Sequence, residues 1–369
     1  MMSEATKTRR VVSIDALRGF DMFWIIGGDQ IFPALLALTG TGWAHALSVQ
    51  FEHQSWNGFH FYDLIFPLFL FIVGAAMPFS LGRRLERGDT PRQVFRHILQ
   101  RALILILLGL ICNGLFNLDF IRLRYAGVLQ RIGITYFFAA IIFMKWKAPR
   151  IQMMIGGIVL LLYWALLTFV PVPGYGMNIL TPQGNLAGYI DRLLLPGSFC
   201  CYEFGDNEGI LSTFPAIVHV LIGIQAGHLL RTGWSDARKT GGLILAGAGC
   251  LIAGLLWNLI FPINKLIWTS SYVLYSGGWS LLLLALFYWM VDVKGWRTWA
   301  FVFVVIGMNP ITIYVAQHII HFHGIANFFI RGLAVHLGPV QALFTALSVF
   351  AVKWLFLYFL FRKKIFLKV

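Results

Sequence analysis

The sequence predicts an all-α, polytopic membrane protein with about ten transmembrane helices and both termini in the cytoplasm. Of its 369 residues, 59% are hydrophobic and only 12% are charged, whereas soluble domains have about 45–50% apolar and about 25% charged residues. The apolar residues form long runs, most of them close to the roughly 20 residues that cross a hydrocarbon core of about 30 Å. The net charge of +14 does not indicate nucleic-acid binding, because the basic residues lie in short clusters between the apolar runs.

The apolar runs define the expected spans and make residues 1–369 one membrane domain. Backbone polar groups in lipid must be bonded within the protein, so each run is expected to be a helix. A membrane β-barrel would alternate polar and apolar residues, and runs such as ALILILLGLI do not alternate. The expected spans are residues 12–38, 61–82, 97–115, 126–144, 152–171, 210–230, 242–261, 267–291, 299–320 and 341–361.

The basic residues orient these spans, because cytoplasmic connections carry an excess of Lys and Arg. With the N-terminus inside, 22 of the 29 basic residues fall at inside ends, six fall at outside ends, and Lys353 lies within the last span. Residues 1–10 are therefore expected to form a basic cytoplasmic N-terminus. Residues 39–60 and 172–208 are expected to be long extracytoplasmic loops, of the kind that serves as a lid or a binding loop.

Ionisable side chains inside a bilayer are unfavourable and call for a reason. In the first span, Asp15, Arg18 and Asp29 lie within about 60° of one another at 100° per residue, so one helical stripe presents all three. We interpret Asp15 and Arg18 as a structural ion pair. Asp29 has no basic partner nearby in the sequence, so it is open to either a structural or a functional role.

The segment FEHQSWNGFHFYDLIFP brings polar groups to the outer end of the second span. A histidine with a carboxylate in reach can be held in one tautomer and act as a general base near neutral pH. Asp63 is the plausible carboxylate, and its alternative role is an anion at a helix N-terminus. The residues alone leave open whether His53 or His60 is the base.

Two further spans carry polar groups. Gln130 and Arg131 lie inside the fourth span, where Arg131 needs an anionic or carbonyl partner. That partner is open between Asp29, Asp63 and a substrate group. In the ninth span Asn309 precedes Pro310, which predicts a helix break there. The H-x-x-H-x-H string that starts at His318 has no carboxylate beside it, so no metal site is expected.

Long stretches of the chain resemble the transmembrane acyltransferase family typified by heparan-α-glucosaminide N-acetyltransferase. They cover nearly the whole chain in the family's order and include SIDALRGF, QSWNGFHFYDLIFPLFLFIVG, AGVLQRIGITYF, EGILSTFPAIVHVLIGIQAG, NKLIWTSSYVL and GMNPITIYV. The resemblance implies the family's helical core without its N-terminal luminal domain and first helix. It also implies a homodimer and a bacterial inner-membrane location.

The resemblance assigns roles to single residues. His53 falls on the family's catalytic histidine, Asp63 on the aspartate of its D-L-[IV]-F-P motif, Arg131 on the arginine of V-L-Q-R, and Asn309 on the asparagine of G-M-N. Asp29 stands where the family has an asparagine at the active centre. As an anion it can orient His53 or a cationic amine, but it cannot donate a hydrogen bond to an oxyanion.

The expected function is acetyl transfer from cytoplasmic acetyl-CoA to an amino sugar of glucosamine type, or to a cell-envelope glycan, on the extracytoplasmic side. The expected catalytic residues are His53, Asp63 and Asp29. Arg18, Arg84 and Arg101 are expected to bind CoA at the cytoplasmic mouth. Arg131, Asn309, Trp56, Asn57, Gln130 and His318 are the candidate substrate-binding residues. The alternative is a transporter for sugars or amino sugars, since buried charges suit that function equally well.

Overall fold

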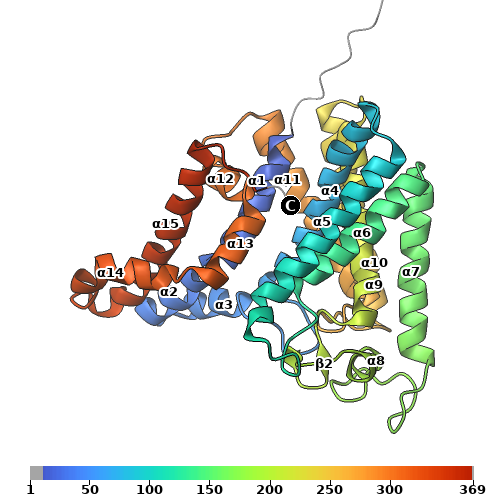
Figure 1. The fold of residues 1–369 in the computed structure, drawn as a ribbon, viewed down its shortest axis with the longest axis horizontal. Helices are drawn as coiled ribbons and strands as arrows, with labels where there is room; N and C mark the ends of the chain where they lie inside the picture. The colour runs from blue at the N-terminus through green and yellow to red at the C-terminus, as the bar shows by residue number, and fades with distance from the viewer. Residues whose placement is uncertain (1–10, 368–369) are drawn as a thin grey trace, which may run out of the picture.

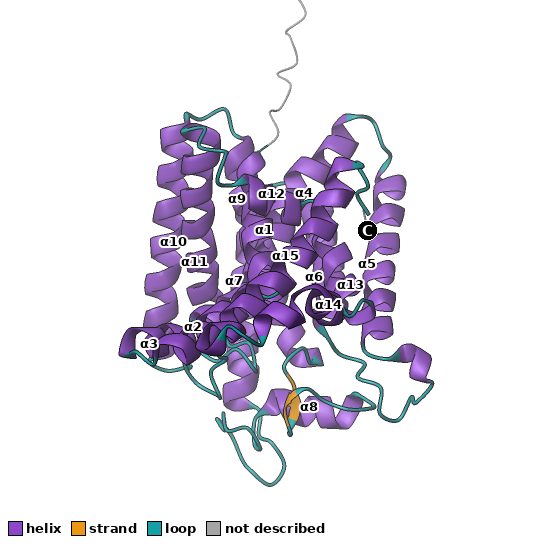
Figure 2. Ribbon diagram, turned by 90° about the vertical axis from the view of Figure 1, so that its left-hand side faces the viewer, coloured by secondary structure: helices purple, strands orange, loops and turns teal. Residues whose placement is uncertain are grey.

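The computed structural model describes residues 11–367, which form a bundle of long helices with a small cap at one end (Figures 1 and 2). Among residues 11–367, eight helices are long and apolar enough to cross a membrane, and the number of spans is up to ten if each of two bent helix pairs forms one span. The expected all-α polytopic membrane fold is therefore confirmed. The eight long helices are α4 (Ile65–Glu86), α5 (Pro91–Cys112), α6 (Val128–Lys145), α7 (Pro149–Phe169), α9 (Ile210–Arg231), α10 (Asp236–Asn258), α11 (Ser270–Phe287) and α15 (Gln341–Arg362).

The first bent pair corrects the prediction of one straight helix over 12–38. Helix α1 (Val12–Ile25) is followed by α2 (Ile31–Thr39) after a bend of 55°. The break lies at Gly27, whose φ of +135° is a conformation that residues with a Cβ rarely adopt. Asp29 lies beyond this bend, so it does not continue the stripe of Asp15 and Arg18 as predicted.

The second bent pair confirms the predicted break. Helix α12 (Phe301–Gly307) and α13 (Pro310–Ile319) meet at 71° on either side of Asn309. Pro310 is the first residue of α13, a position where its missing N–H leaves no helical hydrogen bond unmade.

Three shorter α-helices of the described part of the chain lie outside the spans. Helix α3 (Gly42–Gln50) occupies nine residues of the predicted 39–60 loop. Helix α8 (Leu186–Leu194) lies in the predicted 172–208 loop together with the antiparallel strands β1 (Cys201–Tyr202) and β2 (Gly205–Asp206). Both loops are thus partly regular structure. Helix α14 (Phe322–Ala334), which the sequence did not predict, projects sideways with α2 and α3 (Figure 1).

Close helix packing builds the bundle around α1, α4 and α9. Gly19 of α1 faces the backbone of α12, where an added Cβ would lie 1.6 Å from the Phe303 carbonyl oxygen. Gly223 of α9 faces α4 in the same way, 1.9 Å from the carbonyl oxygen of Phe71. Small residues allow this approach in membrane helices, where packing replaces the hydrophobic effect.

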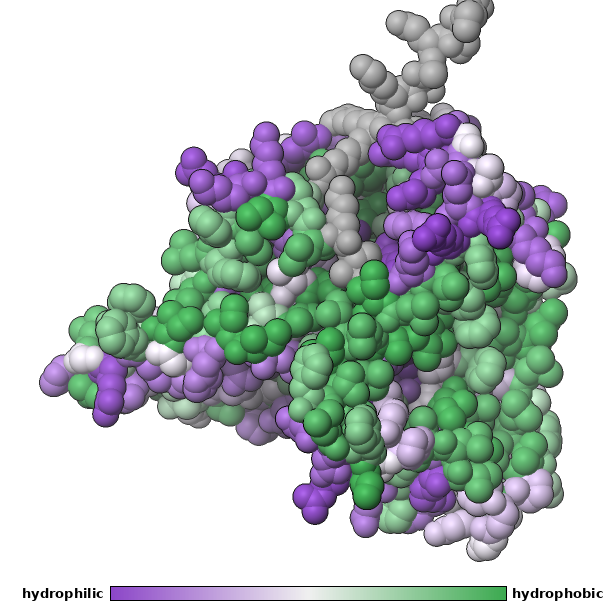
Figure 3. All heavy atoms as spheres, viewed as in Figure 1, coloured by the Kyte–Doolittle hydropathy of each residue, from purple (hydrophilic) through white to green (hydrophobic). Residues whose placement is uncertain are grey.

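The surface separates into an apolar belt and polar ends. Figure 3 shows hydrophobic residues around the middle of the visible face and hydrophilic residues over the upper ends of α4 and α5. Arg83 and Arg84 lie in the last turn of α4 at this end, which we call the basic end. That the basic end faces the cytoplasm stays a prediction; residues 1–10 of the predicted cytoplasmic N-terminus lie outside the described range.

Candidate functional site

Asp63 anchors a polar cluster at the end of the bundle opposite the basic end. It lies just before α4 and its side chain is fully buried. Its Oδ2 accepts hydrogen bonds from the backbone N–H groups of His60, at 3.0 Å, and Gln54, at 3.3 Å. Its Oδ1 lies 2.9 Å from His53 Nδ1. The loop before α4 therefore folds around this carboxylate and places the imidazole on it.

The two histidines of this loop have different surroundings. His53 has a half-exposed side chain, so its ring is accessible from outside the bundle. Both ring nitrogens of His60 are engaged instead, Nδ1 with the Glu52 carbonyl oxygen at 2.9 Å and Nε2 with the Gln54 amide at 2.9 Å. His60 is therefore bonded within the loop through both ring nitrogens, whereas the ring of His53 stays accessible.

Lys265, which the sequence reasoning did not select, is the third member of the cluster. Its Nζ lies 2.8 Å from His53 Nδ1, 3.3 Å from His53 Nε2 and 3.3 Å from Asp63 Oδ1. Burial lowers the pKa of Lys265, and the Asp63 charge opposes that shift. In the sequence Lys265 is one basic residue among six at outside ends, and only its place between two apolar segments marks it.

The connection that carries Lys265 is bonded to the His53 loop. Asn264 donates its side-chain amide to Asn57 Oδ1 at 3.1 Å, and the Gly58 N–H donates to the Ile263 carbonyl at 2.8 Å. Trp56 donates its indole N–H to the Leu180 carbonyl at 2.7 Å. Asn57 and Trp56, both candidate substrate contacts, thus join the loop to its two neighbouring segments.

Asp29 lies near the cluster rather than in it. The Tyr62 ring packs on His53 with centroids 4.8 Å apart, and its hydroxyl is within electrostatic reach of the Asp29 carboxylate. Lys353 also interacts with Asp29 and donates to the Ile26 carbonyl at 2.8 Å. Tyr62 therefore connects Asp29 to His53.

Arg131 of α6 is a buried side chain. It donates to the Gly209 carbonyl and to Ser212 Oγ, and its guanidinium lies 4.8 Å from the centre of the Trp268 ring. Its partners are therefore neither Asp29 nor Asp63, the two pairings that the sequence left open. Its Nε and Nη1, like Nε2 of the buried Gln130, have no hydrogen-bond partner among residues 11–367.

A buried ion cluster holds the segment that binds Arg131. Arg124 donates two hydrogen bonds of 2.7 Å to Asp206 and also contacts Glu208. Burial alone would lower the pKa of Arg124, but the two carboxylates raise it above its ordinary value. This cluster fixes the hairpin strand β2 and the start of α9, and with them Gly209 and Ser212.

Asp191 of α8 completes this support. Its carboxylate accepts the N–H of Ile210 at 2.9 Å and of Asp206 at 3.2 Å, which ties α8 to the start of α9. Burial raises the pKa of Asp191 to about 6, against the lowering effect of these two hydrogen bonds.

The raised pKa of Asp191 predicts a pH-dependent stability. The folded state binds the Asp191 proton more tightly than the unfolded state, so this contribution is full below pH 4 and is lost as pH rises through about 6. Asp191→Asn removes the titration, and its melting temperature should change less between pH 4 and 6 than that of the wild type. Equal slopes in a thermal scan at several pH values would contradict the assignment.

The arginines proposed to bind CoA lie towards the basic end. Arg18 forms the predicted ion pair with Asp15 at 3.2 Å and contacts the Gly307 carbonyl at 3.3 Å. It lines a hollow of about 520 Å³ with Arg83 and Ser80. Arg84 pairs with Asp89 at 3.2 Å, and Arg101 lies over the Tyr136 ring at 4.7 Å. Only Arg18 of the three lines this hollow.

Two candidate substrate residues lie apart from the His53 cluster. Asn309 is buried and binds the C-terminal segment, donating to the Ile365 carbonyl at 3.0 Å and accepting from the Leu367 N–H at 3.2 Å. His318 Nδ1 lies 2.8 Å from the Tyr314 carbonyl, beside a hollow of about 360 Å³ that Lys353 also lines. Within the described range, no group of three or more His, Cys, Asp or Glu is placed to hold a metal ion.

Comparisons with known proteins bear on this site. A sequence profile described as "Heparan-alpha-glucosaminide N-acetyltransferase, catalytic" matches residues 10–252. The chain is 30% identical over 419 aligned residues to the human heparan-alpha-glucosaminide N-acetyltransferase, covering 98% of this chain and 60% of the human protein. It is 32% identical over 380 residues to the mouse protein of the same name, covering 86% and 56%. The chain thus spans about three fifths of the length of these relatives.

Proposed function

Because the chain belongs to the heparan-alpha-glucosaminide N-acetyltransferase catalytic family, we propose that it is a membrane acyltransferase that moves an acetyl group from acetyl-CoA to the amine of a glucosamine-type sugar. The observation that carries this proposal is the contact of a half-exposed His53 with the buried pair Asp63 and Lys265. A cell-envelope glycan is an acceptor of the same chemical class.

His53 acts as the general base in this proposal. In the tautomer whose Nδ1–H donates to Asp63, Lys265 pairs with Asp63 Oδ1 and does not donate to Nδ1, and Nε2 carries the lone pair that takes the proton from the acceptor amine. The amine then attacks the thioester carbonyl, a C–N bond forms, the C–S bond breaks, and the proton passes from His53 to the leaving sulfur. Lys265 balances the charge of Asp63, so the cluster is neutral while His53 is uncharged.

An alternative route has the acetyl group carried by His53 itself before transfer to the acceptor. We favour direct transfer, because Nε2 needs only to accept a proton in that route. Incubation with radiolabelled acetyl-CoA and no acceptor distinguishes the two: direct transfer predicts an unlabelled protein, and an acetyl-histidine peptide in the digest would overturn that preference.

Acetyl-CoA supplies the acetyl group as a thioester, and the basic end offers groups suited to its phosphates. Arg18 and Arg83 line one hollow there, with Ser80 as a further hydrogen-bonding group. This hollow extends along α4 to Ala76. The rise of α4 between Ala76 and its first residue, Ile65, next to the His53 cluster, is about 16 Å. We propose that Arg84 and Arg101 add positive charge near this entrance.

The remaining candidates are assigned by position. We propose that the unpartnered nitrogens of Arg131 and Gln130 bind oxygen atoms of the acceptor sugar or of the thioester carbonyl. Buried donors without a hydrogen-bond partner are unfavourable as long as no substrate is bound. Asp29 orients His53 through Tyr62. The remaining proposed substrate contacts are Trp56 and Asn57, which belong to the loop that carries His53, and Asn309 and His318. A homodimer in a bacterial inner membrane, with the His53 cluster on the extracytoplasmic side, completes the proposal.

The full chain, purified in detergent, tests the proposal when it is mixed with acetyl-CoA and a panel of amino sugars. We expect release of free CoA thiol that depends on the amino sugar, with an equal amount of N-acetylated product by mass spectrometry. Uptake of labelled sugar into proteoliposomes without CoA release would favour transport and contradict the proposal.

Lys265 provides a more specific prediction. Lys265→Met leaves the buried Asp63 carboxylate without its positive partner, so kcat should fall by about tenfold or more. Lys265→Arg keeps the charge and should keep most of the wild-type kcat. An equal loss of kcat in both variants would mean that the charge of Lys265 has no part in the reaction.

A further inference from the structure

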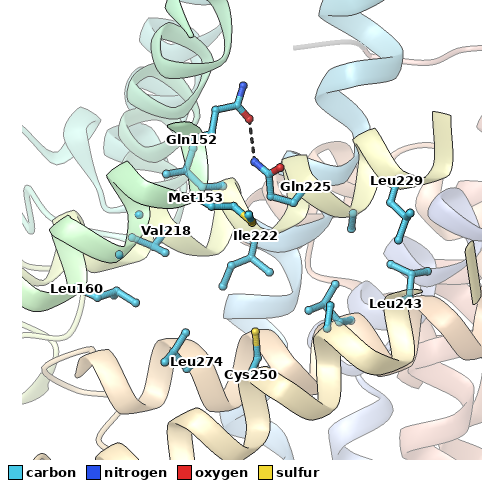
Figure 4. Close-up of a pocket in the computed structure, with 16 residues that line it drawn as sticks. Gln152, Met153, Leu160, Val218, Ile222, Gln225, Leu229, Leu243, Cys250 and Leu274 are labelled. Carbon is cyan, nitrogen blue, oxygen red and sulfur yellow. Dashed lines mark hydrogen bonds between the residues drawn. The ribbon is translucent and has the colours of Figure 1, made fainter. Parts of the chain in front are cut away.

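A crevice that the proposed reaction does not use opens between α7, α9, α10 and α11 (Figure 4). It measures about 320 Å³, and apart from Gln152 and Gln225 its lining is apolar. The two glutamines face each other, and Gln225 Nε2 donates to Gln152 Oε1 at 2.8 Å. The polar groups of the lining are therefore bonded to one another, and the remaining surface suits a hydrocarbon chain.

Small residues keep the crevice open. Gly157 of α7 and Ala246 of α10 line it, and a Cβ added at Gly157 would meet no atom within 4 Å. All four lining helices are spans of the membrane bundle. The medium at the mouth of the crevice is therefore lipid hydrocarbon rather than water.

Two basic residues at one end of the crevice indicate the class of lipid that suits it. Arg150 precedes the lining residues Met153 and Gly157 by three and seven positions, and Lys239 precedes Leu243 and Ala246 by four and seven. At helical periodicity Lys239 lies on the lining face of α10, and Arg150 lies at the edge of the lining face of α7, next to Gly157; both are at the basic end. An anionic headgroup is attracted to such a pair of cations beside a membrane.

We propose that this crevice binds an anionic phospholipid from the leaflet at the basic end, with one acyl chain between α7 and α10 and the phosphate near Arg150 and Lys239. The site is separate from the His53 cluster, so it does not depend on the proposed acetyl transfer. The lipid fills a space between α7 and the rest of the bundle that the protein's own side chains leave empty.

Native mass spectrometry of the full chain, reconstituted with an equimolar mixture of phosphatidylglycerol and phosphatidylcholine of identical chains, tests this proposal. We expect the wild type to retain one phosphatidylglycerol through detergent exchange. Gly157→Phe should reduce that retention about tenfold, because excluding two or three chain methylenes is sufficient for that factor. The double variant Arg150→Gln/Lys239→Gln should retain the two lipids equally.

Gly249→Phe is the matched control. Gly249 is also an exposed glycine of a spanning helix with no atom within 4 Å of an added Cβ, but it does not line the crevice. It should retain phosphatidylglycerol as the wild type does. Retention unchanged in Gly157→Phe, or lost equally in Gly249→Phe, would overturn the proposal. A change of oligomeric mass in Gly157→Phe without loss of lipid would mean that a second copy of the chain covers the crevice.

Discussion

His53→Ala should lower the rate of amino-sugar-dependent CoA release by about 10²–10⁴-fold, the range that a positioned general base contributes. The half-exposed side chain adds little to the packing of the bundle, so the variant should melt near the wild-type temperature. The rate is measured as thiol release from acetyl-CoA, and folding is followed by a thermal scan of the same sample.

His336→Ala is a suitable control, because His336 is an exposed histidine between α14 and α15 that has no part in the proposed site. Its rate should equal that of the wild type. Asp63→Asn should lower the rate as well, since an amide can present its N–H₂ to His53 Nδ1 and favour the wrong tautomer. A His53→Ala variant with the wild-type rate would remove the basis of the proposed mechanism.

Much of the fold follows from local sequence. The spans were predicted from apolar runs, because a bilayer of fixed thickness demands helices of fixed length. The break at Asn309 was predictable because Pro310 has no N–H to donate. The break at Gly27 was missed, since a glycine inside an apolar run is equally compatible with close helix packing, as at Gly19.

A contact between a nearby histidine and Asp63 was predictable for a related reason, although the residues alone left His53 and His60 open and the family resemblance selected His53. His53 and Asp63 are ten positions apart in the same loop, which comes directly before α4. Lys265 joins them from more than 200 positions along the chain, and Arg131 binds Ser212 from 81 positions away. Such contacts depend on which helices pack together, and hydropathy gives the length of a helix but not its neighbours.

The second large effect is expected at Arg124, which supports the candidate site from outside the membrane spans. Arg124→Ala leaves Asp206 and Glu208 buried without their guanidinium partner. Breaking a buried ion pair from one side destabilises a protein by about 3–5 kcal/mol. The loss is measured as a lower melting temperature and a lower denaturant midpoint in detergent.

Arg122→Ala is the matched control for this prediction. Arg122 lies two positions away and faces Asp119 at 3.8 Å, but its side chain is 89% exposed. Exposed ion pairs contribute little, so this variant should stay within about 0.5 kcal/mol of the wild type. Equal destabilisation by the two substitutions would show that burial of the Arg124 cluster does not govern its strength.

The Arg124 cluster also predicts which further substitutions can restore the stability lost in Arg124→Ala. Without the guanidinium, the destabilising groups are two buried negative charges, so Asp206→Asn and Glu208→Gln introduced together with Arg124→Ala should restore part of the lost stability. For the same reason the single variant should become relatively more stable as pH falls and Glu208, whose pKa is raised by burial, takes up a proton. Acetyl transfer should recover less than stability does. Gly209 and Ser212 bind Arg131, and their positions depend on the hydrogen bonds of the native cluster and not only on its net charge. Full recovery of transfer in the triple variant would mean that Arg131 does not depend on this support.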